Sequence, residues 1–256
     1  MLIDAHAHLD DPILAPREEE VIRAAKQAGV GAIVNASSDL PSSESSVALA
    51  ARHKEVYAVI GVHPHEAKTY SPAVEKRLVE LAAEKKVVAF GEIGLDYHYD
   101  LSSREDQKAV LEREIALADE LSLPVVFHVR EAYEDFNAII KRNKSYLTHG
   151  ALLHCYGGSA ELARYYSGEL DAYFSFGGVL TFAKHKDVVL AAIPQERLLL
   201  ETDCPYMTPV PFRGTPNEPK YIPLVRDKMA ELTGRSAEEV ERVTTENALN
   251  FYSIKL

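Results

Sequence analysis

Eight short apolar runs, each followed by a helical stretch, constrain the fold of this 256-residue chain more than any other feature. Continuous apolar runs of this kind are typical of parallel strands that are buried on both faces. The predicted strands cover residues 2–5, 31–34, 56–62, 87–90, 124–127, 151–153, 172–176 and 197–200. Alternation of strand and helix through eight repeats predicts an α/β fold, a single (β/α)8 barrel of the TIM type over residues 1–256.

The segments between the strands have the composition and spacing of helices. The predicted helices cover residues 17–28, 41–52, 71–84, 102–121, 131–141, 159–166, 182–192, 222–232 and 237–250. A loop rich in proline and glycine, residues 205–219, precedes the last two. An open doubly wound sheet is the alternative fold, but it usually carries a glycine-rich phosphate loop after its first strand. Here that place is taken by His6-Ala7-His8.

Charge and cysteine content narrow the class of protein. The chain has 28 basic and 39 acidic residues, a formal net charge of −11, which argues against a broad basic surface for nucleic acid. Bound metal could still attract phosphate locally.

Two cysteines cannot build a disulfide framework, so we expect a reduced, cytoplasmic protein. No signal peptide or apolar run of membrane-spanning length is visible, so no membrane partner is expected, and no feature indicates an obligate protein partner.

Polar side chains that can bind metal stand at the carboxyl ends of five predicted strands. They are His6 and His8 at the first strand, Glu92 after the fourth, His128 and His154 at the fifth and sixth, and Asp203 at the eighth. Barrel enzymes place their active sites at this end of the strands. A lone His-x-His motif or capping carboxylate is usually structural. Six such residues at five strand ends instead indicate a metal site at the C-terminal rim of the strands.

Imidazole and carboxylate groups together suit divalent cations such as zinc, manganese or nickel. Alternate residues of a strand point to the same face, so His6 and His8 can reach one ion. Glu92 is well placed to bridge two ions, and His128 and His154 would then hold the second. We therefore expect two divalent metal ions as cofactors, with magnesium as a further candidate.

Several motifs in a fixed order make the chain resemble a known family. They cover residues 4–10, 61–65, 91–97, 124–130, 153–158, 201–206 and 213–219. Together they resemble the TatD-type metal-dependent hydrolases of the amidohydrolase superfamily, along the whole chain. The resemblance implies a two-metal phosphodiesterase, typically a deoxyribonuclease of the exonuclease kind. Glu131 and Cys204 stand where the family often has Asp and Ala, which loosens the inference about substrate.

The resemblance also implies how the ligands are shared. Metal one would be held by His6, His8, Glu92 and Asp203, and metal two by Glu92, His128 and His154. Metal binding lowers the pKa of water to near 7, which supplies a nucleophile for attack on phosphorus. Asp203 is the best candidate to accept the proton of that water. We expect nucleic acid, DNA above all, as the substrate.

Four neighbours of the ligands have more than one interpretation. His63 and His65 either contact the substrate phosphate and the outer shell of the metals, or form a rigid turn around Pro64. Arg130 either binds phosphate as a planar fork or starts a helix with an ion pair. Glu201 precedes Asp203 by two residues, so both side chains should point to the same face of the strand. Glu201 either orients a ligand histidine or forms a buried ion pair.

Two other functions remain open from the sequence. Similar barrels cleave carboxylic esters, including the ester of D-aminoacyl-tRNA, and many of those carry a carboxylated lysine at the fourth strand. Glu92 stands at that place here, which favours the phosphodiesterase. A non-catalytic metal-binding scaffold is the third interpretation, and the complete ligand set argues against it.

Overall fold

The computed structural model describes residues 1–255 and confirms the (β/α)8 TIM-type barrel as the fold class. Its parallel strands follow one another in the sheet in chain order. They are β1 Leu2–Ala7, β2 Val30–Ala36, β3 Val56–Ile60, β4 Val87–Asp96, β5 Val125–Arg130, β6 Ala151–Leu153, β7 Tyr173–Phe176 and β8 Leu198–Leu200. The α-helices are α1 Glu18–Gln27, α2 Leu40–Arg52, α3 Pro72–Ala82, α4 Arg104–Glu120, α5 Tyr133–Asn143, α6 Ala160–Leu170, α7 Lys186–Leu190, α8 Ile222–Thr233 and α9 Ala237–Phe251.

The described chain divides into two compact units. The first holds residues 1–35 and 158–255, and the second holds residues 36–157. A single domain over the whole chain stays a prediction. In the described residues no helix combines the length and the apolar character that crossing a membrane requires.

Most helices begin where a short polar side chain can cap them. The Asp39 carboxylate accepts from the Ser42 backbone N–H at the start of α2, and Ser42 returns the bond in a capping box. The Ser103, Ser159 and Ser236 hydroxyls each accept from one backbone N–H at the starts of α4, α6 and α9. These caps satisfy backbone donors that have no partner within the helix. The predicted helix boundaries are therefore close to the observed ones.

Strand β5 ends three residues later than predicted, at Arg130, and helix α6 four residues later, at Leu170, but β4 and α7 differ most from the predicted elements. Strand β4 extends to Asp96, beyond the apolar run that ends at residue 90, so Glu92 lies within the strand and not after it. Helix α7 is shorter than the predicted 182–192 and begins at Lys186. His185, which precedes it, has a left-handed backbone with φ of 60°. An L-residue in that conformation cannot belong to a right-handed helix.

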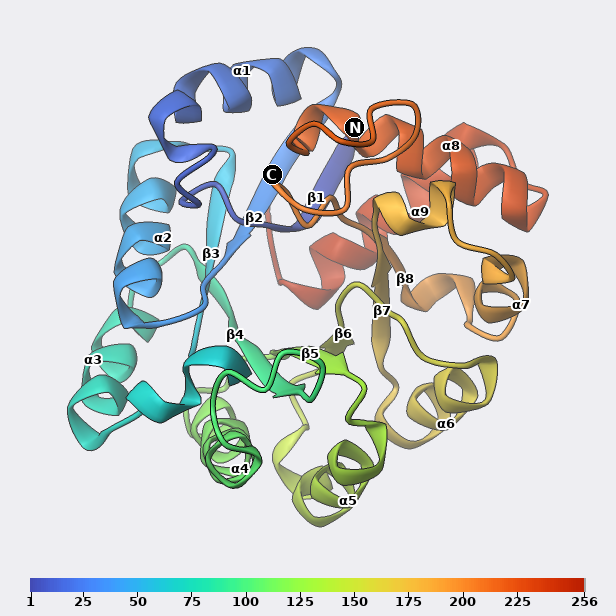
Figure 1. The fold of residues 1–256 in the computed structure, drawn as a ribbon. Coiled ribbons are helices and arrows are strands. Elements are labelled where there is room, and N and C mark those ends of the chain that lie inside the picture. The colour runs from blue at the N-terminus through green and yellow to red at the C-terminus, as the bar shows by residue number, and fades with distance from the viewer. Residues whose placement is uncertain (256) are drawn as a thin grey trace. The chain divides into compact units, whose positions relative to one another are not determined.

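The second unit is built from β3 to β6 and the helices α2 to α5. In Figure 1 these helices lie on the outer side of their strands. Its core contains Phe127 of β5 and Phe136 of α5, whose ring centroids are 5.1 Å apart with an interplanar angle of 78°. Edge-to-face packing of this kind is a favoured arrangement for aromatic pairs. It fixes the helix against the strand that carries His128.

In the first unit, the chain that follows β8 runs beside the end of β1. The Asp203 N–H donates to the His6 carbonyl at 2.9 Å, and the His8 N–H donates to the Cys204 carbonyl at 2.8 Å. Helix α9 packs against both strands. Its last turn is followed by Tyr252, whose hydroxyl donates to the Ala5 carbonyl at 2.7 Å. The two chain segments that carry candidate ligands are thereby held side by side.

A long loop of the first unit, residues 205–219, follows directly. It contains five prolines, at 205, 209, 211, 216 and 219, each of which fixes its own φ angle. Buried Asn217 anchors it, because the side-chain amide donates to the carbonyls of Thr202 and Tyr206, both at 2.7 Å. Residues 210–216 are all exposed. The loop is a fixed element with a protruding tip.

Strands β4 and β5 approach each other closely at Gly94. Its φ is +154°, and a Cβ atom there would lie 1.8 Å from the His128 carbonyl oxygen. We expect Gly94→Ala to lower the free energy of unfolding by at least about 2 kcal/mol, from overpacking and backbone strain together. Urea unfolding measures it. The control is Gly168→Ala in α6, where a Cβ meets nothing within 4 Å. It should stabilise by up to about 1 kcal/mol, and equal effects of the two changes would contradict the analysis.

Candidate metal centre

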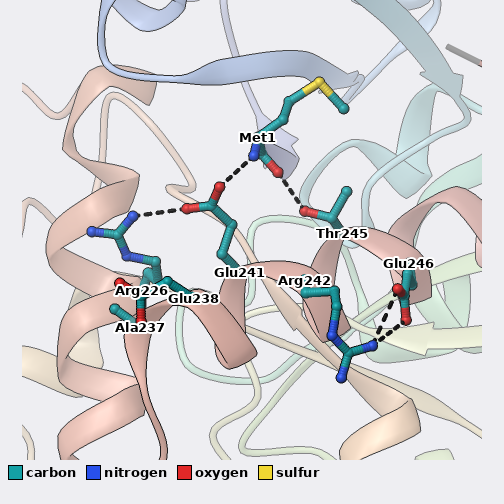
Figure 2. A pocket seen from close by; sticks show the side chains of 8 residues that line it. All are labelled: Met1, Arg226, Ala237, Glu238, Glu241, Arg242, Thr245 and Glu246. Carbon is teal, nitrogen blue, oxygen red and sulfur yellow. Dashed lines mark hydrogen bonds and ion pairs between the residues drawn. The ribbon is translucent and has the colours of Figure 1, made fainter.

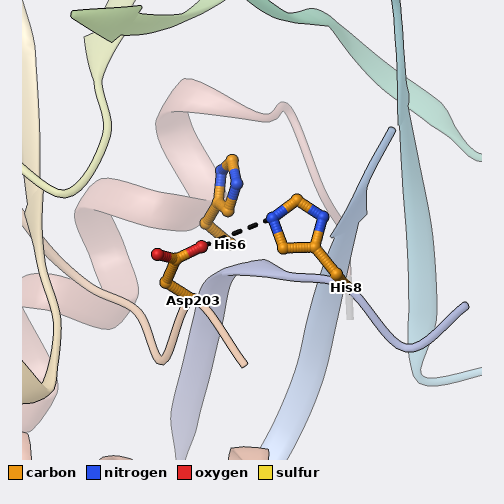
Figure 3. Close-up of side chains that lie close together, drawn as sticks. All are labelled: His6, His8 and Asp203. Atoms are coloured by element: carbon orange, nitrogen blue, oxygen red, sulfur yellow. Dashed lines mark ion pairs between the residues drawn. The ribbon is translucent and has the colours of Figure 1, made fainter. Parts of the chain in front are cut away.

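His6, His8 and Asp203 come together in the first unit (Figure 3). One ligand atom from each lies within 4.8 Å of the other two. His8 Nε2 is 3.3 Å from Asp203 Oδ1, and the two imidazole rings are 5.0 Å apart between centroids. His6 and Asp203 are buried, while His8 is half-buried. The structure thus assembles three of the six predicted ligands around one point.

The buried Asp4 side chain holds Thr202, the residue that precedes Asp203. Its carboxylate accepts from the Thr202 N–H at 2.8 Å and from the Thr202 hydroxyl at 2.5 Å. Burial raises the pKa of Asp4 to about 7, although these bonds oppose the rise. Asp203 follows with a left-handed backbone, φ 54°. A strained conformation of this kind persists only where the surroundings hold it, and it is common at functional sites.

The other three predicted ligands come together in the second unit. Glu92 Oε1 lies 2.6 Å from His154 Nε2 and 2.8 Å from His128 Nδ1. The two histidine nitrogens are 3.2 Å apart. Burial by itself lowers the pKa of His128, but hydrogen bonds to Asp96 and Glu92 outweigh it and raise the value overall. The Glu92 carboxylate is the centre of this cluster.

His63 joins the second cluster as a hydrogen-bond donor. Its Nδ1 accepts from the His65 N–H at 3.1 Å, at the start of the short 3-10 helix η2 Pro64–Thr69. Burial lowers the pKa of His63 to about 3, so the ring is neutral at pH 7. Its single proton is therefore on Nε2, which lies 3.4 Å from Glu92 Oε1. This geometry suits the predicted outer-shell role of His63.

Asp96 contacts two of these histidines, although no role at the metal site was predicted for it from the sequence. It is fully buried, and its Oδ2 lies 3.0 Å from His128 Nε2 and 3.0 Å from His65 Nε2. Burial works to raise the pKa of Asp96, but hydrogen bonds from His128 and the Tyr99 N–H hold it below its ordinary value. The ionised carboxylate orients the imidazole of His128, leaving Nδ1 toward Glu92. The alternation of side chains along a strand could have indicated this position of Asp96. Glu92 and Asp96 are four residues apart in one strand, so their side chains point to the same face.

The donor sets fit divalent cations. Around a tetrahedral ion, ligand atoms bonded at about 2.0–2.1 Å stand roughly 3.4 Å from one another. The separations of 3.2 Å between His128 and His154 and of 3.3 Å between His8 and Asp203 are close to that value. The distances from Glu92 to His154 and His128, 2.6 Å and 2.8 Å, are shorter and are those of hydrogen bonds. Imidazole nitrogen and carboxylate oxygen are also the ligand types that zinc, manganese and nickel accept.

The remaining predicted residues lie as follows. The Arg130 guanidinium lies over the ring of Tyr99, 4.9 Å from its centroid, and makes no ion pair within residues 1–255. The ion-pair interpretation of Arg130 therefore has no support. Glu201 is buried and accepts from the Ser175 hydroxyl at 2.5 Å. Its predicted role in orienting a ligand histidine stays a prediction.

A cavity of about 380 Å³ lies elsewhere in the first unit (Figure 2). It is lined by Met1, Arg226, Ala237, Glu238, Glu241, Arg242, Thr245 and Glu246. Most of its charged groups are paired with each other, since Glu241 contacts both the Met1 amino group and Arg226, and Arg242 contacts Glu246. It contains none of the predicted site residues.

The position of Asp96 behind His128 gives a direct test. We expect Asp96→Asn to weaken divalent-metal binding by about 10–100-fold, because the imidazole loses the carboxylate that orients it. Isothermal titration with Zn²⁺ or Mn²⁺ measures this. The matched control is Asp100→Asn, an exposed residue nearby that pairs with Arg104. Unchanged affinity in the Asp96 variant would remove the orienting role.

Comparison with known proteins gives a consistent result. Residues 3–253 match the model of the family described as TatD related DNase. The chain is 43% identical over 256 residues to the "uncharacterized metal-dependent hydrolase YabD" of Bacillus subtilis, covering 99% of this chain and all of the relative. It is 32% identical to the "3'-5' ssDNA/RNA exonuclease TatD" of Klebsiella pneumoniae, over 99% of this chain and 98% of that protein.

A solved structure agrees with these matches. The TatD homologue YjjV of Escherichia coli superimposes with a TM-score of 0.93 at 31% identity, over 99% of this chain and 98% of that one. The family match spans nearly the whole chain, and the histidines and carboxylates of both units are of the kind that such an enzyme requires. The chain belongs to the TatD family of metal-dependent hydrolases.

Proposed function

We propose that this protein is a metal-dependent phosphodiesterase that hydrolyses nucleic acid, with DNA as the foremost substrate. It would use two divalent cations held by the six predicted ligands, His6, His8, Glu92, His128, His154 and Asp203. We also propose a cytoplasmic location, on the reduced state expected for a chain with two cysteines.

The observation that carries the proposal is the environment of Glu92. Its carboxylate faces the nitrogens of His63, His128 and His154 at 2.6–3.4 Å. Many of the barrels that cleave carboxylic esters carry a carboxylated lysine at this strand instead. Relatives at about the 30% level, from Klebsiella and Pantoea, are named 3'-5' ssDNA/RNA exonucleases. Their names support a nucleic-acid substrate, while the more similar Bacillus relative carries no substrate in its name.

The chain's own residues have separate tasks in this reaction. Divalent cations, when bound, lower the pKa of water and neutralise charge on the phosphoryl group. Asp203 accepts the proton of the attacking water. Arg130, which makes no ion pair in the described chain, offers its guanidinium to a phosphate oxygen. The His63 Nε2–H donates to Glu92 and keeps that carboxylate in place.

Metal removal and a substrate panel test the proposal. Chelation should abolish hydrolysis of single-stranded DNA and of a phosphodiester dye, and Mg²⁺, Mn²⁺, Zn²⁺ or Ni²⁺ should restore it to different degrees. D-aminoacyl-tRNA is the third substrate. Rates and metal content are measured on one preparation. Faster deacylation than phosphodiester cleavage would favour the carboxylic ester hydrolase. Full activity with metal verified absent would overturn the mechanism, and no turnover of any substrate would leave only a metal-binding scaffold.

Two substitutions separate proton transfer from metal capture. Asp203→Asn removes charge and basicity, so the rate should fall by about 10²–10⁴-fold, the usual contribution of a positioned general base. Metal content should fall much less. Glu92→Gln should lose at least one metal together with activity. Asp227→Asn, an exposed residue of α8, serves as the control. A near-normal rate in Asp203→Asn would mean that another group is the base, and loss of both metals would make Asp203 chiefly a ligand.

A further inference from the structure

Exposed aromatic side chains gather on two segments of the first unit. Phe182 follows the 3-10 helix η4 Gly178–Thr181, and Phe212 lies at the tip of the loop of residues 205–219. Each leaves 42% of its surface exposed, and Tyr206 at the start of the loop leaves 51%. Single exposed apolar residues need no explanation, whereas a group of rings on adjoining segments marks a binding surface.

Each of the two phenylalanines lies next to a cation or a stacked ring. The Arg213 guanidinium lies 4.1 Å from the centroid of Phe182. Phe212 stacks on Tyr221 with centroids 4.7 Å apart and an interplanar angle of 23°. The Arg213 guanidinium thus lies against the Phe182 ring, and Phe212, the residue before Arg213, brings a second ring to the same pair of segments. Rings interleaved with cations are the elements that hold unpaired bases and their phosphates.

The charge of these two segments is opposite to that of the chain. Residues 181–186 and 205–221 contain four lysines and arginines and a single carboxylate, Glu218, whereas the whole chain has a net charge of −11. Glu218 pairs with Lys220 at 2.7 Å. Arg213 makes no ion pair with any described residue, and its Nη1 donates to the Thr208 carbonyl at 2.9 Å. A guanidinium that has no carboxylate partner, on a protein of net negative charge, is suited to binding an anionic ligand.

The two segments are fixed against each other before any ligand arrives. The Val210 N–H donates to the Thr181 hydroxyl at 2.9 Å. A Cβ on Gly178 would lie 1.9 Å from the Met207 carbonyl oxygen, so the backbones are in close contact. Binding to rings held in place loses less conformational entropy than binding to a mobile loop.

The loop also begins at the candidate metal centre. The Tyr206 N–H donates to the Asp203 carbonyl at 2.9 Å, and the Tyr206 ring is 6.1 Å from the ring of His8. A chain bound along the loop would therefore run from the tip toward Asp203. This continuity connects the exposed rings with the chemistry proposed above.

We propose that Phe182, Phe212 and Arg213 form a platform on which unpaired bases of a single-stranded nucleic acid stack. The platform rests on the proposed function and extends it: it selects single strands, because only unpaired bases present a free face to an aromatic ring. The Arg213 guanidinium contacts the phosphate between stacked bases.

Binding of a fluorescent 12-nucleotide single strand, followed by anisotropy in EDTA so that it is not hydrolysed, tests the platform. Phe182→Leu and Phe212→Leu keep an apolar side chain but remove the ring face. Each should weaken binding by about 5–150-fold, which corresponds to the 1–3 kcal/mol that one stacked base contributes. The control is Tyr146→Leu, an aromatic residue with 43% exposure in the second unit, which should bind like the parent protein.

An abasic strand of equal length makes the test specific for stacking. Base removal should weaken binding to the parent protein by a similar factor but should affect the leucine variants much less. Leucine variants that bind the intact strand as tightly as the parent would overturn the platform, and so would a parent protein that does not distinguish the abasic strand. Ring-dependent binding without any phosphodiester hydrolysis would leave the platform standing and remove the proposed function. Hydrolysis with unaffected variants would do the opposite.

Discussion

The hydrogen bonds between Asp4 and Thr202 hold together two parts of the chain that are 198 residues apart. Both donors reach one buried carboxylate, so neither Thr202 group is left without a partner in the interior. The backbone bonds of Asp203 to His6 and of His8 to Cys204 continue the same pairing toward the carboxyl ends of the strands. Two histidines from the start of the chain and an aspartate from near its end can therefore share one point.

The second unit uses a different arrangement for the same purpose. Glu92 and Asp96 are on one face of β4 and lie on opposite sides of the His128 ring. Each of its two nitrogens faces a carboxylate, so rotation of the ring would break two interactions at once. A fixed imidazole presents one defined nitrogen to a cation, and an ionised carboxylate behind it makes that nitrogen a stronger donor. The geometry of this cluster thus depends in part on Asp96, a carboxylate outside the predicted ligand set.

The sequence predicted the fold, and it pointed to side chains that cluster within each unit, for one reason: carboxyl ends of parallel strands meet at one rim, so polar residues at those ends are neighbours. It did not identify Asp4 or Asp96 in their supporting roles. An aspartate inside or near a strand has the same appearance whether it caps a turn or orients a ligand, and only the partner's position distinguishes them. The predicted strand β4 was also too short, because the glycines of Gly91-Glu92-Ile93-Gly94 interrupt the apolar pattern. Exposure of Phe182 and Phe212 follows from tertiary packing, which periodicity does not encode.

The construction of the 205–219 loop has a consequence for how such an enzyme diverges. Its shape depends on five prolines and on buried Asn217, whereas Phe212 and Arg213 lie exposed at its tip and contact Tyr221, Phe182 and Thr208, none of which is a predicted metal ligand. Replacing these two side chains therefore leaves the prolines, Asn217 and the predicted metal ligands in place. Under the proposed function, selection can change what the tip binds separately from the metal ligands, so that relatives with one set of ligands can come to prefer different substrates.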